Sequence, residues 1–86
     1  MSNACYTDGE LFDALKKGDY VGYNKLFERY YVRLCRYVYT LLENTEDAED
    51  VVQELFLRLW KNRKQIEIRE NVEGYLFRMA KHLALN

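Results

Sequence analysis

Residues 44–61 read NTEDAEDVVQELFLRLWK, and this run carries the clearest helical pattern in the chain. Its apolar residues recur at three- and four-residue spacings, as on one face of an α-helix. Asn44 and Thr45 offer N-cap oxygens, and the acids that follow lie where the helix dipole favours negative charge. The run therefore predicts an amphipathic helix whose buried residues are Ala48, Val51, Val52, Leu55, Phe56, Leu59 and Trp60.

The flanking sequence predicts three more helices, over residues 8–17, 19–42 and 71–86. Gly18 is suited to a left-handed stop after the first of them, and Asp19 and Asn71 are the predicted N-caps of the other two. Residues 65–71 lack helical periodicity and predict a short extended loop. The second helix is expected to bury Tyr23, Phe27, Tyr30, Tyr31, Leu34, Val38, Leu41 and Leu42, and the last helix Val72, Tyr75, Leu76, Met79, Ala80 and Leu83.

The length and composition agree with an all-α fold. A chain of 86 residues holds one small domain, and its four glycines and lack of proline leave few turns for an all-β fold. We therefore predict a compact bundle of three to four helices that forms a single domain over residues 1–86. The last helix is still apolar where the sequence stops, which suggests that the natural chain continues.

The sequence offers no catalytic or metal-binding constellation. His82 is the only histidine, and the two cysteines, Cys5 and Cys35, form no CxxC pair. A nucleophilic Cys35 assisted by His82 is conceivable, but a small core thiol and a surface imidazole are the more common arrangement. We predict no enzyme, no cofactor and no metal. Free thiols, with no signal sequence and no membrane-spanning run, favour a cytoplasmic protein without membrane insertion.

Charge is unevenly distributed along the chain. Residues 43–54 carry six acids and no base, whereas residues 58–86 carry seven bases and three acids. Opposite the core stripe of the 44–61 helix, one exposed face holds Asp50, Gln53, Glu54 and Leu57. This acidic face favours docking of a partner with basic groups around an apolar spot, although a single exposed leucine is also common on surfaces that bind nothing.

The basic half of the chain suggests a nucleic-acid ligand. The last helix carries Phe77, Arg78, Lys81, His82 and Leu85 away from its core stripe, and the segment before it adds Arg63, Lys64 and Arg69. Cations neutralise phosphates and flat rings accept unstacked bases, so single-stranded nucleic acid is the predicted ligand class. Alternatively, Phe77 and Leu85 pack on something that this chain lacks. A basic row on the second helix, Lys25, Arg29, Arg33 and Arg36, is also predicted to be exposed.

These segments resemble region 2 of the extracytoplasmic-function sigma factors. The resemblance covers nearly the whole chain, through 47–60 (DAEDVVQELFLRLW) and 74–86 (GYLFRMAKHLALN), with shorter likeness at 26–30 (LFERY) and 34–37 (LCRY). It implies a transcription initiation module that binds the RNA polymerase core and recognises the minus-ten promoter element. Two features depart from the family: His82 stands where asparagine is common, and the second, helix-turn-helix domain is absent.

The resemblance also implies roles for individual residues. Asp50, Gln53 and Glu54 match positions that dock on the clamp coiled coil of the polymerase β′ subunit. Residues 65–71 with Tyr75, Arg78 and Lys81 match the elements that capture a flipped base of the non-template strand. The basic row could meet promoter DNA, an anti-sigma factor or only water. The alternative function is a small helical adaptor, or a sigma-binding regulator, in which both charged faces bind proteins.

Overall fold

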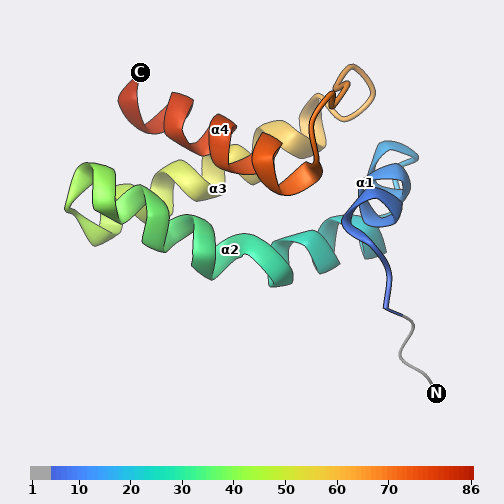
Figure 1. Ribbon diagram of the computed structural model, residues 1–86, viewed down its shortest axis with the longest axis horizontal. Helices are drawn as coiled ribbons and strands as arrows, with labels where there is room; N and C mark the ends of the chain where they lie inside the picture. Colours follow the sequence, from blue (N-terminus) through green and yellow to red (C-terminus); the bar gives the residue numbers. More distant parts are fainter. Residues whose placement is uncertain (1–4) are drawn as a thin grey trace.

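The computed structural model describes residues 5–86, and within them the chain forms four helices and no strand. The helices are α1 (Asp8–Lys16), α2 (Tyr20–Leu42), α3 (Thr45–Lys61) and α4 (Val72–Leu85) (Figure 1). The predicted all-α bundle is confirmed. None of these four helices is long and apolar enough to cross a membrane.

Local signals fix the helix ends. The Asp19, Asn44 and Asn71 side chains each accept a hydrogen bond from a backbone N–H in the first turn of the helix that follows, as predicted. After α1, Gly18 adopts a φ of 86° and its N–H donates to the Leu15 carbonyl, which ends the helix in a left-handed turn. The N-cap of α1, for which no residue is predicted above, is Thr7 in a capping box with Glu10.

Helix α2 is the centre of the bundle and contacts each of the other three helices. Figure 1 shows α2 and α4 running in the same direction, α3 running back between them, and α1 crossing the N-terminal end of α2. Gly22 allows this crossing to be close. A Cβ atom at Gly22 would overlap the Leu11 carbonyl oxygen and lie 2.8 Å from the Leu15 nitrogen.

Within residues 5–86 the core consists of apolar side chains and Tyr30, and it differs in part from the predicted core. Leu26 is fully buried although the expected stripe omitted it, whereas Tyr23, Phe27 and Tyr31 are only half-buried. Their rings lie at the seam between α2 and α3; Phe27, for example, packs against Phe56 of α3 with 4.9 Å between ring centres. Because α2 packs against three helices, its buried surface is wider than one stripe, and periodicity alone does not locate its centre. The buried side chains are Leu11, Phe12, Leu15, Leu26, Tyr30, Leu34, Val38, Ala48, Val52, Leu55, Phe56, Leu59, Val72, Leu76 and Ala80.

Candidate nucleic-acid and protein-binding surfaces

The acidic face of α3 is exposed. Asp50 and Gln53 lie on the surface, Leu57 is 53% exposed, and the Glu54 side chain is 45% exposed. The predicted exposure of Leu57 is confirmed. The structure adds a base to this face, because Arg58 Nε lies 2.6 Å from Glu54 Oε2 one turn away. An apolar side chain flanked by Asp50, Gln53 and one ion pair is thus exposed to a partner.

A groove between α2 and α3 borders this face. It has a volume of about 250 Å³ and is lined by Cys35, Arg36, Tyr39, Thr45, Ala48 and Glu49. Glu49 lies one turn before Gln53, so the groove and the acidic face adjoin. Burial raises the pKa of the Cys35 thiol, which favours the uncharged form. A half-buried thiol without thiolate character is consistent with a packing role for Cys35.

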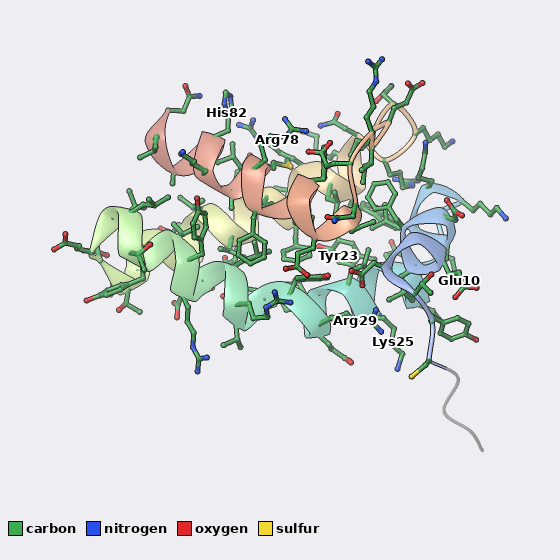
Figure 2. All side chains as sticks on the ribbon, in the orientation of Figure 1. Glu10, Tyr23, Lys25, Arg29, Arg78 and His82 are labelled. Atoms are coloured by element: carbon green, nitrogen blue, oxygen red, sulfur yellow. The ribbon has the colours of Figure 1, made fainter. Side chains whose placement is uncertain are left out.

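The outer face of α4 brings together three predicted DNA-binding residues. Arg78, Lys81 and His82 are all exposed and, with Leu85 and Asn86, they line a shallow hollow of about 320 Å³. Figure 2 shows Arg78 and His82 on the side of α4 that faces away from α2, whereas Lys25 and Arg29 lie on the opposite side of the molecule. Within α4, the predicted cationic face is thus one continuous surface.

Both aromatic residues of α4 that were expected to bind DNA are turned inward, as predicted for Tyr75 of the buried stripe but not for Phe77. Phe77 is half-buried and packs edge-on against Tyr37 of α2, with 5.3 Å between ring centres. Tyr75 is also half-buried and lies 6.5 Å from the Phe12 ring of α1, and burial raises its pKa. The expectation of an exposed Phe77 is wrong, because α2 supplies an aromatic neighbour at that level of α4. These contacts leave cations, rather than these two rings, on the outer surface of α4.

Arg78 is held by the loop that precedes α4. Its Nε donates to Glu70 Oε2 at 2.8 Å, and its guanidinium carbon lies 5.6 Å from the centre of the Tyr75 ring. The hydrogen bond from Arg78 holds the pKa of the Glu70 carboxyl below its usual value, and Glu70 raises the pKa of Arg78. This pair was not foreseen, since no sequence pattern signals a contact between residues eight positions apart across a helix start.

The segment between α3 and α4 is fixed at its other end by Arg63. The guanidinium of Arg63 lies over the Trp60 ring, 4.1 Å from its centre, and Nη1 donates to the Trp60 carbonyl at 2.8 Å. Arg63 is therefore half-buried, unlike the exposed Lys64 and Arg69 with which it was grouped. The expectation that Arg63 presents its charge outward is wrong. Its guanidinium stacks on Trp60, and its buried Nε has no hydrogen-bond partner within residues 5–86.

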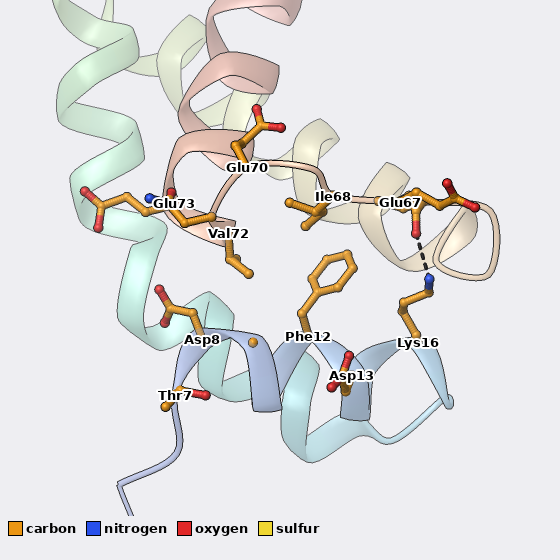
Figure 3. Close-up of a pocket in the computed structure, with 13 residues that line it drawn as sticks. Thr7, Asp8, Phe12, Asp13, Lys16, Glu67, Ile68, Glu70, Val72 and Glu73 are labelled. Atoms are coloured by element: carbon orange, nitrogen blue, oxygen red, sulfur yellow. Dashed lines mark hydrogen bonds between the residues drawn. The ribbon is translucent and has the colours of Figure 1, made fainter.

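A cavity separates this segment from α1. It has a volume of about 730 Å³, and Figure 3 shows Phe12, Ile68 and Val72 around it together with acidic side chains. Lys16 Nζ donates to the Ile66 carbonyl at 2.8 Å and links α1 to the segment across the cavity. The carboxylates that line it are Asp8, Asp13, Glu67, Glu70 and Glu73. The inner side of the loop is thus acidic, in addition to the exposed bases Lys64 and Arg69 that the sequence predicts.

Half of the basic row on α2 is engaged in internal ion pairs. Arg29 Nη1 lies 2.7 Å from Asp8 Oδ1 of α1, and Arg33 Nη2 lies 2.8 Å from Glu73 Oε2 of α4. Between them, the buried Tyr30 hydroxyl donates to Asp8, and burial together with this carboxylate raises the pKa of Tyr30. The other two members of the row, Lys25 and Arg36, are exposed and make no ion pair within residues 5–86.

Comparison with known proteins identifies the family. Residues 26–86 match the family described as Sigma-70 region 2. The chain is 29% identical over 72 residues to the ECF RNA polymerase sigma factor SigW of Bacillus subtilis (strain 168), a match that covers 84% of this chain and 38% of that protein. It therefore spans well under half the length of that relative.

A solved structure extends the comparison to the fold. An engineered region 2 of sigmaE, determined by NMR in a complex with GTAAAA, superposes with a TM-score of 0.83 at 27% sequence identity. The match covers 98% of this chain and 87% of that one. The resemblance seen in the sequence is confirmed, and the chain belongs to the sigma-70 region 2 family, with its likeness to the extracytoplasmic-function sigma factors.

Proposed function

We propose that this chain is the promoter-recognition domain of a transcription initiation factor, which binds RNA polymerase and the opened minus-ten strand. The observation that carries the proposal is the likeness, over 98% of the chain, to a region 2 structure in complex with GTAAAA. The domain would act by binding and not by catalysis, in the cytoplasm, where polymerase and promoter meet. Residues 1–86 would form this one domain within a longer factor.

The outer face of α4 would hold the DNA. Arg78, Lys81 and His82 form one exposed surface that can contact successive phosphates, and Lys64 and Arg69 extend it along the loop. Tyr75, Phe77 and Arg63 would support this surface from below, since each is packed against a neighbouring aromatic ring. Base capture needs no catalyst, because unstacking costs about a few kcal/mol per step and protein contacts can offset it.

The acidic face of α3 would bind the β′ clamp of the polymerase. Leu57 offers an exposed apolar anchor, and Asp50, Gln53 and Glu54 surround it with polar groups that orient a basic partner. The groove beside it enlarges the contact area available between α2 and α3. An anti-sigma factor is a further proposed partner. It would meet Lys25 and Arg36, the two cations of the basic row that make no ion pair within residues 5–86.

The polymerase half is tested by capture of a purified β′ clamp fragment on the immobilised chain. Gln53→Ala combined with Glu54→Ala removes one amide and one carboxylate from the proposed interface and should abolish capture. A matched control is Asn24→Ala with Glu28→Ala, which removes the same groups from the exposed surface of α2. Undiminished capture by the α3 variant would refute the proposal that this face binds the β′ clamp. It would favour the alternative function, an adaptor that binds other proteins.

The DNA half is tested by fluorescence anisotropy with a labelled single strand containing GTAAAA. Arg78→Ala with Lys81→Ala should weaken binding and flatten its salt dependence. A variant that has lost two phosphate contacts releases fewer counterions from the strand when it binds. Lys25→Ala with Arg36→Ala removes two exposed cations from α2 and serves as the control. Equal losses in the two variants would show that net charge, and not the α4 face, binds the strand.

A further inference from the structure

We propose that Glu70 controls whether Arg78 is available to DNA. In the free chain the Glu70 carboxylate occupies the Arg78 guanidinium, and a phosphate of the bound strand must take its place. The inference rests on the proposed function, in which Arg78 contacts phosphate. Glu70 thus takes part in nucleic-acid binding as a regulator of Arg78, although a negative charge by itself disfavours contact with phosphate.

The geometry of the pair fits a displaceable contact. Arg78 Nε and Glu70 Oε2 are 2.8 Å apart, and the two side chains remain 66% and 37% exposed. The Tyr75 ring lies against the same guanidinium, so the Arg78 side chain keeps a supporting contact when the carboxylate leaves. An exposed ion pair contributes little to stability, and exchanging it for another anion therefore does not threaten the fold.

The chemistry of the two anions makes them direct competitors. A guanidinium presents its N–H donors in a fixed fork that suits carboxylate and phosphate oxygens equally well. A phosphate that approaches Arg78 Nε meets the Glu70 oxygen already at that donor, and the displaced carboxylate then repels the phosphate at short range. Removing the negative charge at Glu70 should therefore strengthen binding rather than weaken it.

Glu67 provides an internal control for this argument. It lies three residues before Glu70 in the same loop, is exposed, and lines the same acidic cavity. Within residues 5–86, however, no Lys, Arg or His side chain pairs with Glu67. Glu67→Gln and Glu70→Gln thus remove the same charge from one loop, and only the second change frees a cation on the α4 face.

The experiment measures binding of the 86-residue chain to a fluorescein-labelled single strand containing GTAAAA, at low and at high salt. Glu70→Gln should bind about two- to fivefold more tightly at low salt, the range expected for loss of one exposed ion pair that competes with the ligand. Its log–log salt dependence should be steeper by up to about 0.7, the value of one added phosphate contact on a single strand. Glu67→Gln should change both quantities less.

A double variant separates competition from a general charge effect. In an Arg78→Ala background, Glu70→Gln should no longer tighten binding beyond the effect of Glu67→Gln in the same background. Circular dichroism should show unchanged helix content and unfolding temperature for each variant. Equal effects of the two Gln variants, or weaker binding by Glu70→Gln, would overturn the role of Glu70 alone. Absence of binding by the wild-type chain would instead overturn the proposed function on which this role rests.

Discussion

Gly22 at the crossing of α1 and α2 allows a quantitative test of the packing. In Gly22→Ala the new methyl group would lie 2.8 Å from the Leu15 nitrogen and closer still to the Leu11 oxygen. We expect α1 to move outward by about 0.5 Å and to keep part of this overlap as strain. The side chains that α1 buries, Leu11, Phe12 and Leu15, are each worth about 1.5–3 kcal/mol when fully buried. A gap of this size forfeits about a quarter of such contact energy.

These contributions give a net loss of stability. Lost packing amounts to about 1–2 kcal/mol, and strain from the overlapping backbone adds about 1–3 kcal/mol. The better helix propensity of alanine returns about 1 kcal/mol. We therefore expect Gly22→Ala to lower the free energy of unfolding by about 1–4 kcal/mol. Each kcal/mol corresponds to a fall in Tm of about 4–8 °C.

Urea unfolding followed by far-UV circular dichroism measures this free energy. The matched variant is Gly9→Ala, because Gly9 lies in α1 and the nearest atom to an added Cβ is Thr7 Oγ1 at 3.9 Å. Gly9→Ala should leave stability unchanged or raise it by up to about 1 kcal/mol. A Gly22→Ala variant as stable as the wild type would refute the close approach of the two helices.

Three further predictions concern titratable groups. Tyr30→Phe should lower stability at neutral pH by about 1–2 kcal/mol, because it removes the hydroxyl that donates to Asp8. Since the pKa of Tyr30 is raised in the fold, its contribution is complete below the ordinary value of 10.0 and is lost as the pH rises above it. Urea titrations at neutral and alkaline pH should therefore show a steeper alkaline loss for the wild type than for the variant. The Glu70 carboxyl should titrate below its ordinary value of 4.5 in NMR spectra, and Arg78→Ala should raise that midpoint; its contribution to stability is lost as the pH falls through the lowered pKa. With Ellman's reagent, the half-buried Cys35 should react more slowly than the exposed Cys5, and Cys35→Ala should remove the slow phase alone.

The helix boundaries could be predicted from the sequence because their causes are local. Asp19, Asn44 and Asn71 cap helices through bonds to residues two or three positions away, and Gly18 ends α1 through its own φ angle. The capping box at the start of α1 carried an equally local signal, a threonine followed three residues later by a glutamate, and could have been recognised.

The roles of individual side chains depended on contacts that the sequence does not encode locally. The exposed face of α3 follows from helical periodicity alone, and so does that of Arg78 and Lys81 on α4. Phe77 was misplaced because its neighbour, Tyr37, comes from another helix, and the pairing of Arg33 with Glu73 spans 40 residues. The packing of the helices therefore determines which charged side chains form internal ion pairs and which remain available to a partner.

The segment between α3 and α4 has no regular structure, yet it is tied down at three places. Arg63 holds its start to Trp60, Lys16 holds the Ile66 carbonyl, and Glu70 holds its end to Arg78. Ligands that fold a loop on arrival lose affinity to the entropy of ordering it. The contacts of Arg63 and Lys16 hold the segment before any ligand arrives, even where Glu70 releases Arg78 to a phosphate. Association should therefore show a small change in heat capacity and little rearrangement of the backbone.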